Sequence, residues 1–205
     1  MQPLEAFRTS HPYEAVRRFH QTRSPNPQWV RCRAGLPSAL MHIPALVNMQ
    51  YQTQWCWAAS IAMVFARYGF AVQQERIVED AFGAVVNMPA YPDEILGALT
   101  GRWEDELGRP FEVRSGVGWA FVNEIIRDLA HDHPVIVGTR GHAMVLTALE
   151  YVRPSRSLHE GSTPLHVAAA VVRDPWPGIG RRILTEEEWR SVDLAARIRV
   201  APLPY

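Results

Sequence analysis

An apolar helix directly after a polar segment is the feature of this sequence that most constrains its fold. Residues 57–66 are apolar except for one serine, and no helix-breaking residue occurs before Gly69, which is typical of a buried helix closed by a C-terminal glycine. The polar segment 50–55 precedes this helix, and Cys56 stands at the junction. Unpaired N–H groups and the positive dipole end of a helix favour the thiolate form of a cysteine in the first turn. We therefore predict that Cys56 is a nucleophile.

Two later segments offer a base and a carboxylate at the ends of predicted strands. Apolar runs at 134–138 and 141–151 predict a β-hairpin, and His142 lies at the start of its second strand. A further predicted strand, 166–173, is followed by Asp174 and then by a proline-rich turn. In this order His142 would accept the thiol proton, and Asp174 would bind the other ring N–H and fix the tautomer.

Three of these elements together resemble bacterial papain-like cysteine proteases, in particular the effector and toxin group with a Trp-Cys-Trp-Ala-Ala segment. The elements are Gln50 placed six residues before Cys56-Trp-Ala-Ala, Gly141-His142 opening an apolar strand, and Asp174-Pro-Trp. The resemblance covers roughly residues 44–190 and is carried by the three elements jointly.

The resemblance implies a fold, a reaction and a site. The fold is α+β and papain-like, in which a helical half carrying the nucleophile packs on an antiparallel β-sheet half. The reaction is peptide-bond cleavage by a triad of Cys56, His142 and Asp174 through a thioester acyl-enzyme. Gln50 would supply its side-chain amide to the oxyanion hole beside the Cys56 N–H, and Gln54 is the competing candidate.

The chain also departs from papain itself. Trp55 directly precedes the nucleophile, and the third triad member is an aspartate where papain has an asparagine. Transporter-linked peptidases that trim double-glycine leaders share the order of Gln, Cys, His and Asp. We rank them third, because no membrane segment follows in this sequence.

Two alternatives to proteolysis stay open. A papain-like deamidase or transglutaminase would form the same thioester from an amide and differ only in the acceptor. A catalytically inactive binding module on the same scaffold would keep the fold without the reaction. We expect the partner to be a protein or peptide substrate, with an immunity or inhibitor protein as a further partner.

No metal or cofactor is expected. The histidines of the segment 131–133 follow a predicted helix, 119–130, and suit its C-terminal end. Cys32 and Cys56 are the only cysteines, so no paired thiolates are present for zinc. Three tryptophans near the proposed site are candidates to line a substrate cleft, with core packing as the alternative: Trp55, Trp57 and Trp176.

Charge and hydropathy exclude other classes of function. The 21 basic and 21 acidic residues cancel, which gives no general attraction to nucleic acid. No apolar run approaches the roughly twenty residues of a membrane helix, and the first residues lack a signal-peptide pattern. Because a disulfide between Cys32 and Cys56 would remove the thiolate, we expect an effector exported by another route and acting in a reducing cytoplasm. The bacterial cytoplasm is the alternative.

The sequence predicts one catalytic domain, 44–205, preceded by an N-terminal extension or propeptide-like segment, 1–43, that is rich in polar residues and proline. Short helices are expected at about 75–82, 92–99 and 185–189, in addition to the one at 119–130, and an extended loop at 109–118.

Overall fold

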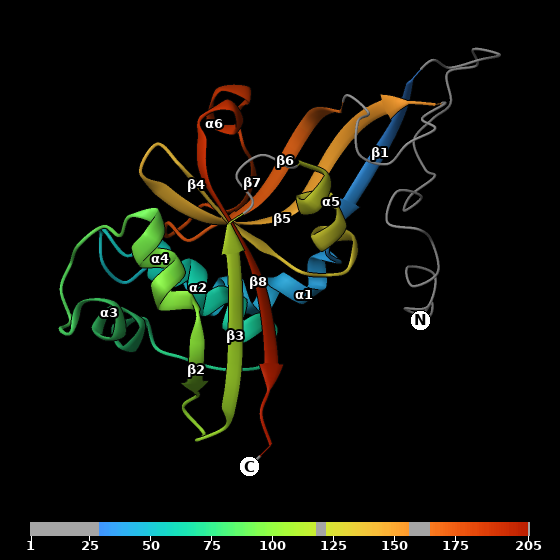
Figure 1. Ribbon diagram of the computed structural model, residues 1–205. Helices are drawn as coiled ribbons and strands as arrows, with labels where there is room; N and C mark the ends of the chain where they lie inside the picture. The colour runs from blue at the N-terminus through green and yellow to red at the C-terminus, as the bar shows by residue number, and fades with distance from the viewer. Residues whose placement is uncertain (1–28, 118–121, 156–164, 205) are drawn as a thin grey trace.

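The computed structural model describes residues 29–117, 122–155 and 165–204, which form one eight-stranded antiparallel sheet and six helices (Figure 1). The strands are β1 (Trp29–Gly35), β2 (Gly101–Glu104), β3 (Pro110–Val117), β4 (Val135–Thr139), β5 (His142–Pro154), β6 (His166–Asp174), β7 (Gly180–Ile183) and β8 (Val192–Pro202). The helices are α1 (Ser38–Val47), α2 (Cys56–Arg67), α3 (Gln74–Phe82), α4 (Pro92–Leu99), α5 (Val122–Ala130) and α6 (Glu186–Arg190). The predicted α+β class is confirmed.

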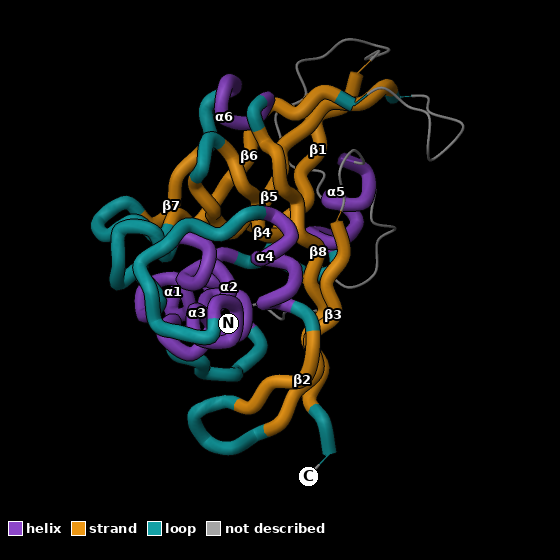
Figure 2. The backbone as a smooth tube through the Cα atoms, turned by 60° about the vertical axis from the view of Figure 1, so that its left-hand side comes forward, coloured by secondary structure: helices purple, strands orange, loops and turns teal. Residues whose placement is uncertain are grey.

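The sheet order is β2-β3-β8-β4-β5-β6-β7, and β1 pairs with the outer part of β5. Helices α1, α2 and α3 are grouped together, apart from α5 (Figure 2). Helix α2, which begins at Cys56, contacts α1, α3 and β5. Every residue of α2 from Cys56 to Phe65 is buried, because a helix that is apolar on nearly every side is stable only where other elements cover it. The chain leaves this helix through Gly69, whose φ of +88° suits glycine.

The β4–β5 hairpin forms as predicted and places His142 at the start of β5. Thr139 pairs with His142, so Arg140 and Gly141 form a two-residue turn. Both turn residues have positive φ, 53° and 75°, which matches the twist of a tight hairpin. This turn fixes the register of β5, and therefore the position of the His142 side chain.

The predicted short helices are confirmed as α3, α4 and α6, and Pro92 is the first residue of α4. The helix expected at 119–130 is present as α5; residues 119–121 lie outside the described residues. The prediction of an extended loop at 109–118 is wrong, because residues 110–117 form strand β3. Phe111 and Val113 of that strand are buried and their neighbours are less so, which is the alternation of a strand with one buried face.

Residues 29–43 share the hydrophobic core with the residues that follow them. Strand β1 pairs with β5 from Trp29 to Gly35, and its Cys32 and Ala34 are buried. The boundary expected between residues 43 and 44 lies inside α1, and the division of the chain there stays a prediction. Within the described ranges, no helix is long and apolar enough to span a membrane.

Candidate active site

Cys56 is the first residue of α2 and its side chain faces the start of β5. The residue is 8% exposed, and its Sγ accepts a hydrogen bond from the Ala143 N–H at 3.4 Å. One turn further along α2, Ser60 Oγ donates to the Ala143 carbonyl at 3.2 Å. The N–H and the carbonyl of Ala143 therefore both bind α2. These two hydrogen bonds hold the thiol against β5, the strand that carries His142.

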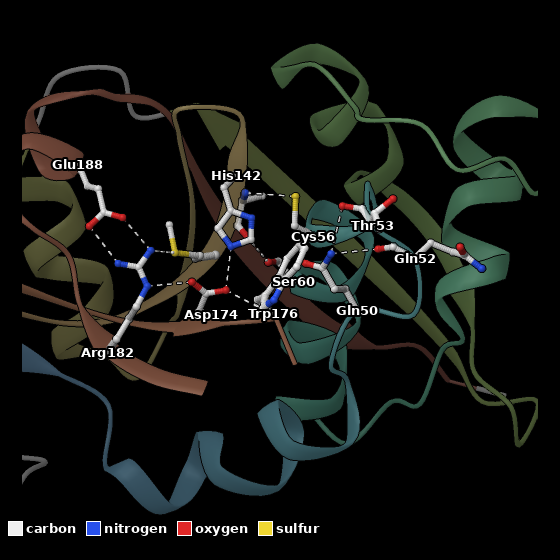
Figure 3. Close-up of polar contacts among 12 residues, drawn as sticks. Gln50, Gln52, Thr53, Cys56, Ser60, His142, Asp174, Trp176, Arg182 and Glu188 are labelled. Carbon is white, nitrogen blue, oxygen red and sulfur yellow. Dashed lines mark hydrogen bonds and ion pairs between the residues drawn. The ribbon is translucent and has the colours of Figure 1, made fainter. Parts of the chain in front are cut away.

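His142 and Asp174 form a hydrogen-bonded pair beside this thiol (Figure 3). His142 Nε2 lies 2.8 Å from Asp174 Oδ1, which leaves Nδ1 of the same ring to take a proton from Cys56. Burial would lower the pKa of His142, but hydrogen bonds with Asp174 and Cys56, and their negative charges, outweigh it and raise the pKa to about 9. The three residues singled out by the sequence are thus brought together.

Asp174 is 2% exposed and receives three hydrogen bonds. Its Oδ1 also accepts from the Trp176 N–H at 2.9 Å, and its Oδ2 accepts from Arg182 Nε at 2.8 Å. Burial would raise the pKa of the Asp174 carboxyl, but the bonds from His142, Trp176 and Arg182 hold it below its usual value. The carboxylate that binds the imidazole is therefore ionised at neutral pH.

Arg182 binds Asp174, and Glu188 in turn binds Arg182. Neither residue was predicted from the sequence to belong to the site. Both terminal nitrogens of Arg182 bind Glu188, at 3.0 Å and 2.8 Å, while its Nε binds Asp174. The pKa of Glu188 is lowered by the Arg182 hydrogen bond, against the effect of burial. Figure 3 shows Glu188, Arg182, Asp174 and His142 in a row. No local signal in the sequence marks Arg182, since it follows another arginine in a short edge strand.

Helix α6 supports the site in a second way, through the hairpin turn. Thr139 Oγ1 donates to the Glu188 carbonyl at 2.7 Å, and Arg140 forms an ion pair with Glu187. Thr185 caps the helix and accepts from the Glu188 N–H, while the Glu188 side chain accepts from the Thr185 N–H. One short helix therefore holds both the turn before His142 and the arginine bound to Asp174.

Gln50 is buried beside the nucleophile segment, but its amide N–H groups are already engaged. Nε2 donates to the carbonyls of Gln52 at 3.0 Å and Thr53 at 3.2 Å. Its Oε1 is buried without a hydrogen-bond partner among the described residues. Rotating the amide by half a turn would place Oε1 against those two carbonyls, so the observed orientation is the favourable one. In this arrangement Gln50 shapes the loop before α2, and the Gln54 side chain is exposed.

The three tryptophans occupy different environments. Trp55 and Trp57 are buried, and their indole N–H groups donate to the carbonyls of Val86 and Met88. Both therefore have almost no surface to offer a substrate, and they pack as core aromatics. Trp176 is 45% exposed next to Asp174, which leaves it as the tryptophan that can border a cleft.

Cys32 is buried in β1, and both cysteines are free thiols. His131 closes α5 as expected, because its N–H and its Nδ1 both lie within hydrogen-bonding distance of the Arg127 carbonyl. In the part of the chain that the structure describes, no group of three or more potential ligands is arranged to hold a metal ion.

A buried thiol, an imidazole and an ionised carboxylate in this order form the kind of site that cysteine peptidases use. Residues 43–190, more than half of the chain, match the model of the peptidase C39-like family, and the protein belongs to that family. Family membership identifies a hydrolase of the cysteine peptidase type. No curated protein matches the chain.

Among solved structures, the chain is similar to the double-glycine motif protease from an AMS/PCAT transporter, in complex with the leader peptide. They share 20% identity, with 76% of this chain and 89% of that chain covered and a TM-score of 0.44. The peptidase domain of Streptococcus ComA, a bi-functional ABC transporter, is 19% identical over 75% of this chain and 96% of that one, with a TM-score of 0.43. UfSP from C. elegans is 17% identical over 77% of this chain and 32% of that one, with a TM-score of 0.41.

Proposed function

We propose that the protein is a cysteine peptidase in which Cys56, His142 and Asp174 form the catalytic triad. One observation carries the proposal: the thiol at the start of α2 interacts with an imidazole whose other nitrogen binds a buried carboxylate. Each of the three side chains is fixed by a separate backbone feature, namely a helix start, a hairpin turn and a strand end, which supports the proposal.

The reaction follows from these contacts. His142 Nδ1 takes the Cys56 proton, and the resulting imidazolium is stabilised by the Asp174 carboxylate. The thiolate attacks the substrate carbonyl to form a tetrahedral intermediate. His142 then gives its proton to the leaving amine, which leaves a thioester on Cys56. Water, deprotonated by His142, hydrolyses the thioester and restores the thiol.

The oxyanion needs donors at the start of α2. The Cys56 N–H is one, because the first N–H groups of a helix have no intrahelical partner. Gln50 is proposed as the second, and for this role one of its N–H groups must leave the carbonyl of Gln52 or Thr53. That exchange would accompany substrate binding.

The proposed substrate is a peptide or protein, in keeping with the family. A role as a secreted effector or toxin is the finer part of the proposal, and its support is the Trp-Cys-Trp-Ala-Ala segment at residues 55–59. Both cysteines are free thiols, which suits a reducing cytoplasm.

The test compares wild-type protein with Cys56→Ala on peptide libraries and on bacterial and eukaryotic cell extracts, with mass spectrometry of the products. New N-termini made by the wild type and absent with Cys56→Ala are the expected result. Circular dichroism of both proteins checks that Cys56→Ala is folded. Cys32→Ala is the matched control, because it removes the other buried thiol and should leave cleavage intact.

Other outcomes would replace the proposal. A gain of one dalton at a glutamine or asparagine, without new N-termini, would identify a deamidase. No covalent change in any extract, together with equal alkylation rates for Cys56 in wild type and His142→Ala, would identify an inactive binding module.

A further inference from the structure

A polar cavity lies where residues of β1 and of the start of α1 meet residues of β6 and β7, and none of Cys56, His142 and Asp174 lines it. It is small and partly open to solvent. Three arginines line it, and no acidic side chain among the described residues does: Arg33, Arg173 and Arg181. The catalytic mechanism uses none of the three.

Arg173 is the central cation of this cavity. It is 8% exposed, and among the described residues its Nη2 donates to Ser38 alone, to Oγ at 3.2 Å and to the carbonyl at 3.4 Å. Its Nε is buried with no hydrogen-bond partner among the described residues. Burial and the positive charge of Arg181 lower the pKa of Arg173. A buried charge held only by neutral oxygens is costly, and an anion would offset that cost.

The neighbouring charges increase this cost. Arg181 lies directly opposite Arg173 in the β6–β7 pairing, so two like charges share one side of the sheet edge. Glu150 lies opposite Arg33 in the β1–β5 pairing, but its ion pair is with Arg31 at 2.8 Å and it does not line the cavity.

The N-terminus of α1 adds a further positive element at the same place. The helix has ten residues, begins at Ser38, has no side-chain cap and carries no acidic residue in its first turn. The Leu40 N–H donates to the Pro37 carbonyl at 3.0 Å, and the positive dipole end of the helix lies beside Arg173 without an acidic residue in the first turn.

We propose that this cavity binds a small oxyanion of the phosphate type, held by the guanidinium groups of Arg33, Arg173 and Arg181 and by the start of α1. Guanidinium forks match the oxygens of phosphate and sulfate in pairs, and the Ser38 hydroxyl can donate to the same ion. The cavity is far smaller than a pocket for a drug-sized ligand, which suits a small ion. The site is independent of the proposed peptidase activity.

The test is isothermal titration with inorganic phosphate, together with thermal unfolding in phosphate and in chloride at equal ionic strength. Wild-type protein should bind phosphate with 1:1 stoichiometry. At about ten times the Kd its Tm should rise by roughly 3–6 °C. Sulfate should act like phosphate, and acetate should act more weakly because it presents fewer oxygens.

Three variants separate site binding from general salt effects. Arg181→Gln, on an exposed position of an edge strand, should weaken phosphate binding at least tenfold, and so should Arg33→Gln. Arg181→Glu should raise the Tm in chloride, because a carboxylate then faces Arg173, and should abolish the response to phosphate.

Arg114→Gln is the matched control, since it removes a 78% exposed arginine from β3, outside the cavity, and should respond to phosphate as wild type does. Equal phosphate responses in wild type, Arg181→Gln and Arg114→Gln would overturn the proposal, because they would reflect general stabilisation by an excluded salt. Absence of any heat of binding with an unchanged Tm would overturn it as well.

Discussion

Replacing Asp174 by asparagine is the sharpest test of how this site is held, because every partner of that carboxylate is a donor. Oδ1 accepts from His142 Nε2 and the Trp176 N–H, and Oδ2 accepts from Arg182 Nε. An asparagine has one oxygen and one NH₂ group, so its NH₂ must face a donor. If the NH₂ group faces Arg182, one hydrogen bond is lost. If it faces His142 and Trp176, two hydrogen bonds are lost. We expect Asp174→Asn to keep the imidazole tautomer and lose Arg182.

The magnitude follows from those contacts. Breaking a buried ion pair by removing one partner costs about 3–5 kcal/mol. Arg182 is partly exposed and keeps both bonds to Glu188, so we expect Asp174→Asn to lower the free energy of unfolding by roughly 2–3 kcal/mol at pH 7. Because the tautomer is kept, kcat/KM should fall by roughly 10- to 100-fold, well below the about 10⁴-fold loss that follows a wrong tautomer.

The assay measures kcat/KM against pH on a cleaved peptide, urea unfolding, and the His142 titration by NMR. The pKa of His142, about 9 in wild type, should move down toward its ordinary value in Asp174→Asn, since a negative charge is lost. Asp193→Asn, at an exposed position of β8, is the control and should leave all three measurements unchanged. An unchanged His142 titration and unchanged stability in Asp174→Asn would refute the reasoning.

Three further predictions concern the groups around this carboxylate. Gln50→Ala should lower kcat by roughly 10- to 1,000-fold with little change in KM if its amide reaches the oxyanion, and a larger loss in Gln54→Ala than in Gln50→Ala would reverse the assignment. Arg182→Gln should lower kcat/KM less than loss of the nucleophile does and should shift the pH profile, whereas a purely structural role would reduce stability and leave the profile in place. The raised pKa of His142 should stabilise the fold fully below about pH 6.5, and this contribution, at most about 3 kcal/mol, should disappear as the pH rises through about 9. Urea unfolding from pH 6 to pH 10 measures it, and a His142→Ala protein with the same pH dependence as wild type would contradict it.

The positions of Cys56, His142 and Asp174 in the fold could be predicted because each depends on a local pattern. An apolar run without helix breakers begins at Cys56, a glycine in a short connection precedes His142, and a proline follows Asp174. Each pattern fixes the backbone within a few residues, and side-chain direction follows from the backbone. The α+β class could be predicted for the same reason, since helical and strand periods are short-range.

Strand β8 shows what local patterns miss. It lies between β3 and β4, and its apolar positions from Ala196 to Val200 alternate with two arginines. Its Arg197 and Arg199 bind Asp128, a buried carboxylate on α5. The two arginines are tolerated in this strand because Asp128, about seventy residues earlier on α5, neutralises their charge. A short stretch of sequence cannot contain both the arginines and this aspartate.

The sequence by itself therefore determined the positions and order of Cys56, His142 and Asp174 in the fold, because helix start, turn and strand end are local properties of the backbone. Only the tertiary structure decided what surrounds them. The row from Asp174 through Arg182 to Glu188, the engagement of the Gln50 amide by its own loop, and the burial of Trp55 and Trp57 all depend on contacts set by sheet register and packing. Such contacts form between elements that are far apart in the sequence, so the spacing of residues along the chain does not predict them.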